Sequence, residues 1–285
     1  MRTSISRREF AQEFLFPNRP VIIADGLRNW SALDTWTPDY FRDRFGDRVI
    51  HVDAEPISVA EFVDHLRAAT ETKPAPYLKA TGPGNYLTDL FPELATDVQP
   101  VPEYCLPNWL GEKFSFPLLS RRLNRGPRAE MFFGGCGSGF PVLHWDSLHF
   151  HAFNGQVFGE KEWVLYGPDE TEHLYPKTNA PNQSEIKDVF APDLERFPLA
   201  AQAQRYQCTM RPGELLFVPA GWWHTTRMMG PSISVAINSA NASNWPGVRR
   251  ELVRKARAKN GLFAAALDFY LGRVEARLSR RDGEV

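Results

Sequence analysis

The 285-residue sequence contains few cysteines, no marked excess of either charge and no long apolar run. Its three cysteines, Cys105, Cys136 and Cys208, are far apart and form no Cys-x-x-Cys pair. This argues against a disulfide framework and indicates reduced thiols in a cytoplasmic protein. A formal net charge of −1 argues against nucleic-acid binding by bulk charge. Charged residues interrupt the chain too often for a membrane span, and the N-terminal residues lack the apolar stretch of a secretory signal.

Short apolar segments dominate the second half of the chain. Six of them, separated by glycine and proline, are AEMFFGG, FHAFNGQVF, KEWVLYG, QRYQCTM, GELLFVPA and SISVAINS. This spacing is typical of an all-β barrel or jelly roll. Up to residue 80, short strands alternate with helices, such as the helix that begins at Thr37-Pro38 and the amphipathic helix capped by Ser58. Because no flexible or charged linker separates the two halves, we expect the N-terminal elements to cover the β-core.

Residues 82–128 are rich in proline, glycine and aromatic residues, and we expect a long, partly helical connection there. From Val248 onward two helices are predicted, divided at Gly261. Over residues 249–285 there are ten Lys/Arg against five Asp/Glu, which favours a solvated face over a surface for RNA or an acidic partner. The second helix carries an apolar stripe that either packs on the core or forms a homodimer seam: Leu262, Phe263, Ala266, Leu267, Tyr270, Leu271, Val274 and Leu278.

A metal site is predicted where two segments combine. In PVLHWDSLHFHAF (141–153), His144 and Asp146 would point to the same face of an extended strand. In PGELLFVPAGWWHTT (212–226), His224 follows an apolar strand and a turn. Two histidines and one carboxylate leave three coordination positions open, as in non-haem Fe(II) sites that react with O₂, whereas structural zinc needs a fourth protein ligand. Either segment alone is weak, since a single histidine among apolar residues is more often a packed core residue.

Two further histidines, His149 and His151, share a face with each other. In an unbroken strand they would point away from His144, although a turn at Ser147-Leu148 could change that. We expect them to line the pocket or to pack behind the metal site.

The segments FPVLHWD, NGQVFGEKEWVLYGP and MRPGELLFVPAGWWHTT resemble the core motifs of Jumonji-C, cupin-like oxygenases, which depend on Fe(II) and 2-oxoglutarate. The likeness extends upstream through RPVIIADGLRNWSALDTWTPDYFRDRFGD, ISVAEFVDHL and PYLKA, and it covers residues 15–245. The sequence is most similar to the small hydroxylase branch. The resemblance implies a mainly β fold with a double-stranded β-helix (jelly-roll or cupin) core, flanking N-terminal α/β elements and C-terminal helices. We expect a catalytic domain over 1–245 and a helical segment over 246–285.

Carried over by residue, the metal ligands of the family fall on His144, Asp146 and His224. The lysine that pairs with the distal carboxylate of 2-oxoglutarate falls on Lys161. A lysine entering the apolar strand KEWVLYG needs an anionic partner if it points inward. The alternative is a surface lysine beside two glutamates.

Three weaker assignments follow from the same resemblance. Tyr77 matches a tyrosine that hydrogen-bonds the same carboxylate in some members, and Asn154 and Asn238 match asparagines near the cosubstrate in others. All three could be ordinary strand or turn residues. The sequence also departs from the family, with Pro141 and Ala236 where some members have threonine. Part of the cosubstrate hydrogen bonding must therefore differ, or be supplied by Tyr77 or water.

The resemblance implies hydroxylation of an unactivated C–H bond of a protein or peptide side chain, with O₂ and 2-oxoglutarate as cosubstrates. The alternatives are a small metabolite or a tRNA base as substrate, or a metal-binding cupin without oxidative activity. Such cupins often use a His-x-His pair, whereas Asp146 holds the second position here. No membrane partner is expected, nucleic acid is disfavoured, and the C-terminal helices could form a homodimer.

Overall fold

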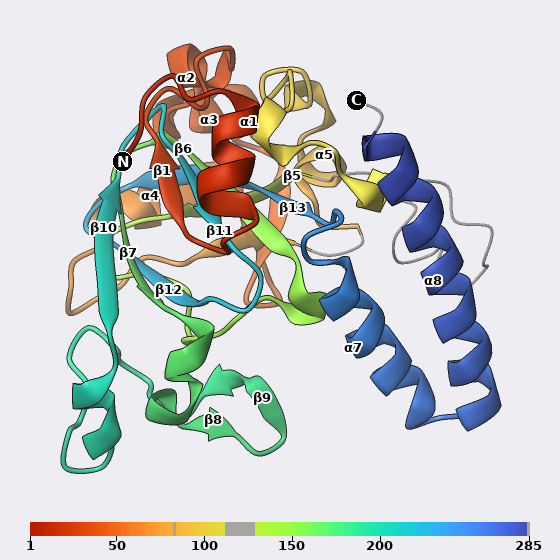
Figure 1. Cartoon of the computed structure of the whole chain (residues 1–285). Helices are drawn as coiled ribbons and strands as arrows, with labels where there is room; N and C mark the ends of the chain where they lie inside the picture. The colour runs from red at the N-terminus through yellow and green to blue at the C-terminus, as the bar shows by residue number, and fades with distance from the viewer. Residues whose placement is uncertain (82–83, 112–128, 284–285) are drawn as a thin grey trace.

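Two antiparallel sheets form the centre of the protein in the computed structural model, which describes residues 1–81, 84–111 and 129–283 (Figure 1). The larger sheet has six strands, in the order β1 (Val21–Ile23), β11 (Leu215–Val218), β6 (His151–Phe158), β13 (Ser232–Ser239), β5 (Ala129–Gly134) and β4 (Leu78–Ala80). The smaller sheet has three, in the order β10 (Arg205–Met210), β7 (Lys161–Tyr166) and β12 (Trp223–Met228). The predicted jelly-roll core with flanking helices is confirmed.

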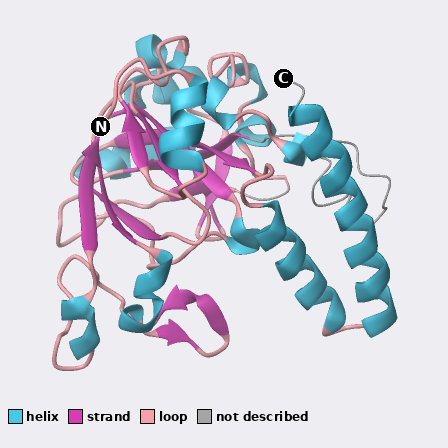
Figure 2. Cartoon of the chain, in the orientation of Figure 1, coloured by secondary structure: helices cyan, strands magenta, loops and turns pink. Residues whose placement is uncertain are grey.

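Two hairpins lie outside these sheets, and the sequence did not predict their pairing. They are β2 (Val49–Val52) with β3 (Glu55–Ser58), and β8 (Pro176–Lys177) with β9 (Ala180–Ser184). Figure 2 shows most strands gathered at the centre and left, with helices above them and two long helices to their right. Short 3-10 helices occupy the longer connections: η5 (Ser147–His149), η6 (Pro168–Leu174) and η7 (Pro198–Gln202).

Strand β13 shows how the larger sheet separates core from cavity. Ile233, Val235 and Ile237 are buried in the main apolar core. The alternate residues Ala236 and Asn238 line a cavity on the opposite face. This period of two places apolar groups under the N-terminal helices and polar groups toward the smaller sheet.

The N-terminal helices cover the outer face of the larger sheet. They are α1 (Arg7–Phe10), which continues into the π-helix η1 (Ala11–Leu15), then α2 (Ala32–Thr35), α3 (Pro38–Phe45) and α4 (Val59–Ala68). The predicted starts of α3 and α4 are confirmed, because Thr37 and Ser58 cap them by accepting hydrogen bonds from main-chain N–H groups. Phe41 of α3 and Phe62 of α4 both pack on Phe133 of β5, at ring distances of 5.3 and 5.2 Å.

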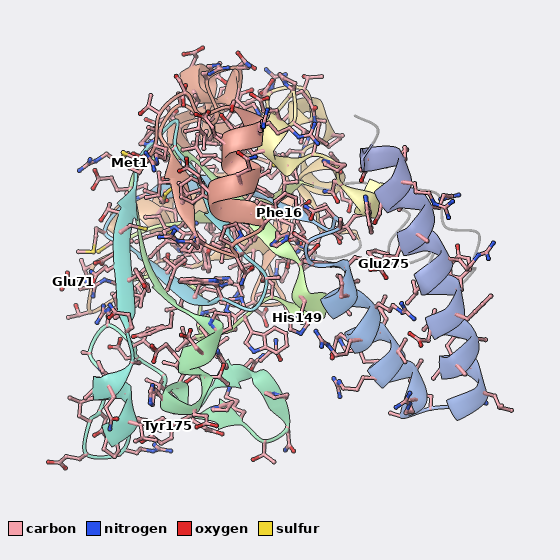
Figure 3. The ribbon with its side chains drawn as sticks, viewed as in Figure 1. Met1, Phe16, Glu71, His149, Tyr175 and Glu275 are labelled. Atoms are coloured by element: carbon pink, nitrogen blue, oxygen red, sulfur yellow. The ribbon has the colours of Figure 1, made fainter. Side chains whose placement is uncertain are left out.

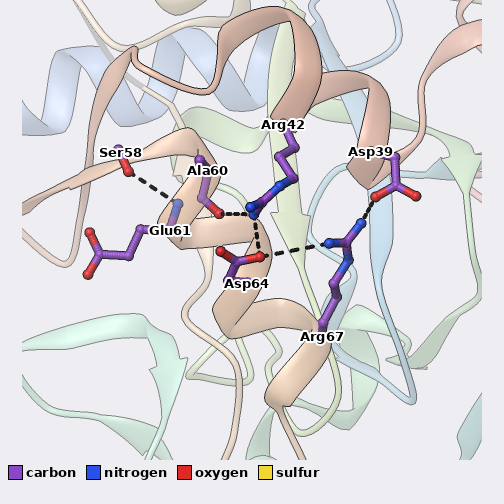
Figure 4. Close-up of polar contacts among 7 residues, drawn as sticks. All are labelled: Asp39, Arg42, Ser58, Ala60, Glu61, Asp64 and Arg67. Atoms are coloured by element: carbon purple, nitrogen blue, oxygen red, sulfur yellow. Dashed lines mark hydrogen bonds and ion pairs between the residues drawn. The ribbon is translucent and has the colours of Figure 1, made fainter.

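Arginines fix α3 against α4 at the surface (Figure 4). Arg42 donates to the carbonyl oxygen of Ala60 at 3.1 Å and pairs with Asp64. Arg67 pairs with Asp39 and lies 3.8 Å from Asp64. Because these groups are well exposed, the network orients the two helices and adds little stability.

The predicted irregular connection is described from residue 84 to 111. There it contains only short helices: α5 (Leu87–Leu90), η2 (Pro92–Leu94), η3 (Glu103–Cys105) and η4 (Trp109–Gly111). The rest of that prediction, residues 82–83 and 112–128, lies outside the described residues.

Helices α7 (Trp245–Arg257) and α8 (Gly261–Gly283) form an antiparallel pair beside the β-core (Figure 1). Most of the predicted apolar stripe is used within the chain. Four members are buried in a cluster with residues of α7: Leu267, Leu271, Val274 and Leu278. Phe263 and Tyr270 are partly buried and pack against the same cluster. Leu262 remains 86% exposed. A homodimer through these helices stays a prediction. Across the described part of the chain, no helix combines the length and apolarity needed to cross a membrane.

Candidate active site

The residues predicted to bind a metal come together between the two sheets. His144 and His224 are joined by two main-chain hydrogen bonds, from His144 N to His224 O at 3.1 Å and from His224 N to His144 O at 2.7 Å. Asp146 Oδ1 lies 3.7 Å from Nε2 of His144 and 3.9 Å from Nε2 of His224. One potential ligand atom from each of the three residues lies within 4.8 Å of the others, so the group can hold a metal ion.

Main-chain carbonyls set the tautomer of both histidines. Nδ1 of His144 is 3.1 Å from the oxygen of Val142, and Nδ1 of His224 is 3.0 Å from the oxygen of Trp222. A carbonyl only accepts, so each Nδ1 carries the proton and donates it. Each Nε2 is left with its lone pair free beside Asp146, which is how metal-binding histidines are commonly held.

The charge state of His144 also suits a metal ligand. Burial, with a contribution from the neighbouring His224, lowers the pKa of His144 to about 4. The imidazole is therefore neutral near pH 7, as metal binding requires.

A turn separates His144 and Asp146 from the next two histidines along the chain, His149 and His151. Leu148 and His149 have φ of +65° and +52°, a left-handed conformation that is uncommon outside glycine. The turn breaks the strand, so side-chain alternation from His144 does not extend to His149 and His151. His149 stacks on Trp145 at 4.7 Å and lies beside the start of α7 (Figure 3).

His151 is a packed core residue. It is 1% exposed, its Nδ1 accepts a hydrogen bond from Ala220 N at 3.0 Å, and its Nε2 lies 2.8 Å from Ser243 Oγ. Burial lowers its pKa to about 3. Neither His149 nor His151 is among the residues that line the cavity described next. Both therefore pack around the triad, which is one of the two positions expected for them.

A cavity of about 450 Å³ extends from the triad between the sheets. All seven predicted site residues line it: Tyr77, His144, Asp146, Asn154, Lys161, His224 and Asn238. Residues that the sequence reasoning did not select also line it, among them Thr81, Tyr86, Glu130, Phe132, Phe140, Leu148, Phe150, Trp163, Gln183 and Thr226.

Lys161 enters the cavity from β7 and is only 2% exposed. Its Nζ donates a hydrogen bond to Ser234 Oγ and lies 5.4 Å from the ring centre of Phe132. No carboxylate of the described residues forms an ion pair with it. Burial lowers its pKa to about 7. An ammonium group held this way is costly unless an anion joins it, so the site fits an anionic ligand.

The remaining predicted residues supply hydrogen-bonding groups around Lys161 and the triad. Tyr77 is buried, which raises its pKa, and it hydrogen-bonds Thr226. Its phenol therefore stays protonated at physiological pH. Asn154 of β6 lies opposite Ala236 of β13, and both line the cavity. The Ala236 methyl group donates no hydrogen bond there, but the Thr226 hydroxyl lines the same cavity from the smaller sheet.

Glu130 is a cavity residue that the sequence reasoning missed. Burial, followed by the negative charge of Asp146, raises its pKa to about 7, and a hydrogen bond with Asn238 acts in the opposite direction. The strand AEMFFGG did contain a signal, because Glu130 and Phe132 share one face of β5. If Phe132 points inward, so does Glu130.

Comparisons with known proteins agree with this geometry. Residues 6–239 match the family model described as the cupin-like domain. Lysine-specific demethylase 8 of Xenopus tropicalis is 30% identical over 239 residues, which are 81% of this chain and 50% of that protein. The tRNA wybutosine-synthesizing protein 5 of Gallus gallus is 27% identical over 253 residues, 82% of this chain and 74% of that protein.

A third relative is the bifunctional peptidase and (3S)-lysyl hydroxylase of Homo sapiens, 28% identical over 256 residues, 79% of this chain and 78% of that protein. The chain thus spans about half the length of the demethylase and about three quarters of the other two. With a single family model matching most of its length, the chain belongs to the cupin-like, Jumonji-C family.

Proposed function

We propose that this protein is an Fe(II)- and 2-oxoglutarate-dependent oxygenase that hydroxylates an unactivated C–H bond of a protein or peptide side chain. The observation that carries the proposal is the buried ammonium group of Lys161, which shares a cavity with the His144, Asp146 and His224 triad. A metal with open positions and a buried cation that line the same cavity match the two ends of a 2-oxo dicarboxylate.

Each residue has a distinct part in this proposal. The triad holds Fe(II) and leaves coordination positions for the 2-oxo acid and O₂. Lys161 pairs with the distal carboxylate, and the Tyr77 phenol donates a hydrogen bond to it. Bound there, the metal supports oxidation of 2-oxoglutarate by O₂ to succinate and CO₂, with the second oxygen atom inserted into the substrate C–H bond. The aromatic residues Phe132, Phe140 and Trp163 line the cavity, and Trp163 is buried, so they limit the contact of the site with water.

A side chain of a protein or peptide is the favoured substrate because two of the relatives described above are named for acting on lysine. The relative named for tRNA wybutosine synthesis keeps a tRNA base as the second candidate. A small metabolite is a further alternative substrate. The following test separates the oxygenase from a non-oxidative metal-binding cupin.

The test is anaerobic titration of Fe(II) and 2-oxoglutarate into the metal-free protein, followed through the weak visible charge-transfer band of the chelate. We expect the band in the wild type, its loss in Asp146→Ala, and a higher 2-oxoglutarate requirement in Lys161→Ala. Lys187→Ala is the matched control, because Lys187 is exposed on the surface. Bound iron without any band on addition of 2-oxoglutarate would refute the oxygenase and favour the non-oxidative cupin.

A further inference from the structure

Glu130 lines the cavity with a carboxylate on the inner face of the larger sheet. It lies on β5, where Met131 and Phe133 are buried in the apolar core on the opposite face. It pairs in register with Ala236 of β13, which in turn pairs with Asn154 of β6. These three side chains form a row across the sheet, all lining the cavity.

The charge of Glu130 has no cationic partner within the described residues. Its hydrogen-bond partner is the amide of Asn238, and the charge that raises its pKa is the like charge of Asp146. A carboxylate has about four acceptor positions, so one amide leaves most of them free. Glu130 is only partly exposed, and holding a charged carboxylate there without a cation costs free energy.

Lys161 does not serve as that cation. Its pKa is lowered by burial alone, and the pKa of Glu130 is raised, so neither charge relieves the other. In the proposed function Lys161 is neutralised by the distal carboxylate of 2-oxoglutarate, and Asp146 by the metal. Glu130 is then the one carboxylate among the described cavity residues without a counter-charge.

We infer that Glu130 determines specificity by binding a cationic substrate side chain, an ammonium or guanidinium group, beside the metal triad. This rests on the proposed function and names the class of its substrate. A cationic group would satisfy the free acceptor positions of Glu130, whereas a neutral isostere would leave them unpaired and an acidic side chain would be repelled. Leu148 and Phe150 line the same cavity and offer apolar surface to the aliphatic stem of such a side chain.

The experiment uses the holoenzyme with peptide pools that have randomised flanks and one fixed central residue. Lysine is compared with norleucine, arginine with citrulline, and asparagine and glutamate serve as further pools. Hydroxylation is read as the mass of one added oxygen on the central residue, together with succinate formed. We expect the lysine or the arginine pool to exceed its neutral isostere at least about tenfold.

Variants of Glu130 separate charge recognition from general damage. In Glu130→Gln that preference should fall to within about twofold, and Glu130→Asp should retain part of it, because a charged group contributes more than a neutral amide. Glu185→Gln, at an exposed position, is the matched control and should keep the wild-type preference.

The outcomes distinguish the inference from the function on which it rests. Wild-type protein that forms succinate but treats lysine like norleucine and arginine like citrulline would overturn the role of Glu130 while leaving the oxygenase intact. Hydroxylation of a tRNA base, or of no cationic pool despite a normal chelate band, would also overturn it. Absence of the band itself would reject the proposed function instead.

Discussion

Replacing Lys161 by methionine should make the ligand-free protein more stable and abolish its tight binding of 2-oxoglutarate. The side chain is 2% exposed, and its Nζ is hydrogen-bonded only to Ser234 within the described structure. Methionine has a similar volume and length and needs no counter-charge. The same residue is therefore expected to weaken the fold and to create the proposed binding site for 2-oxoglutarate.

The magnitude follows from the pKa of Lys161, which falls from 10.5 to about 7. This difference corresponds to at most about 5 kcal/mol of unfavourable free energy for the charged form in the folded state. The variant loses the hydrogen bond to Ser234, and this loss offsets about 1 kcal/mol of the expected gain in stability. We expect the free energy of unfolding of Lys161→Met to exceed that of the wild type by about 1–4 kcal/mol near pH 6. This is the range measured when buried charges are replaced by apolar groups.

The lowered pKa of Lys161 also determines whether stability rises or falls with pH. The unfolded chain keeps the proton on Lys161 up to about pH 10.5, whereas the folded chain releases it near pH 7. Between these values the unfolded state binds more protons, so wild-type stability should rise with pH relative to the variant, by up to about 1.4 kcal/mol per unit. The advantage of Lys161→Met should therefore be largest below pH 7 and shrink as pH approaches 10.5.

The assay is urea unfolding of metal-free wild type, Lys161→Met and the exposed control Lys187→Met between about pH 6 and 9. The control should differ from wild type by less than about 0.5 kcal/mol at each pH. A Lys161→Met variant that is less stable than wild type, or whose difference from wild type does not change with pH, would refute the reasoning. So would undiminished 2-oxoglutarate binding by the variant.

Four further outcomes are expected. The affinity for 2-oxoglutarate should fall by up to about tenfold per unit above pH 7, since the dianion needs protonated Lys161, and calorimetry at several pH values in buffers of different ionisation heat would detect the proton uptake. Asp146→Ala should weaken Fe(II) binding more than about 100-fold in competition with a chelator, and a smaller loss would mean that another group replaces the carboxylate. His151→Leu should cost about 2–4 kcal/mol in urea unfolding while the Fe(II) affinity of the folded protein is unchanged, whereas a parallel loss of iron would place His151 in the site. Gly159→Ala should lower the free energy of unfolding by more than about 2 kcal/mol, because Gly159 has φ +65° and an added Cβ would lie 2.0 Å from a proline carbonyl oxygen. Gly230→Ala is the control and should be neutral in the same assay, because an added Cβ there would have no atom within 4 Å.

The sequence was most informative where a local pattern determines the structure. Short apolar segments separated by glycine and proline predicted the strands of the larger sheet, and the caps Thr37 and Ser58 marked helix starts correctly, because both depend on neighbours a few residues away. The convergence of His144 with His224 was predicted from two separate segments. The structure brings them side by side, and their role as metal ligands remains a prediction.

The features that the sequence reasoning missed depend on contacts between distant strands. Glu130 resembles an ordinary solvent-facing strand residue until the smaller sheet is placed over it. Ser234 is likewise ordinary until Lys161 lies beside it. The sequence leaves a turn at Ser147-Leu148 open as an alternative, because no glycine or asparagine marks the left-handed conformation that Leu148 and His149 adopt. Side-chain alternation could therefore not decide where His151 points.

Two main-chain hydrogen bonds hold His144 beside His224, and neither bond involves a metal ion. If the triad binds Fe(II) as proposed, folding and metal loading are expected to be separate steps, unlike in a zinc finger, whose chain unfolds when its ion is removed. The ion should be extractable from the folded protein and exchangeable for a redox-inactive one of similar size. A protein loaded in that way would hold its substrate without consuming it, so that the physiological target could be captured from a cell extract and identified by mass.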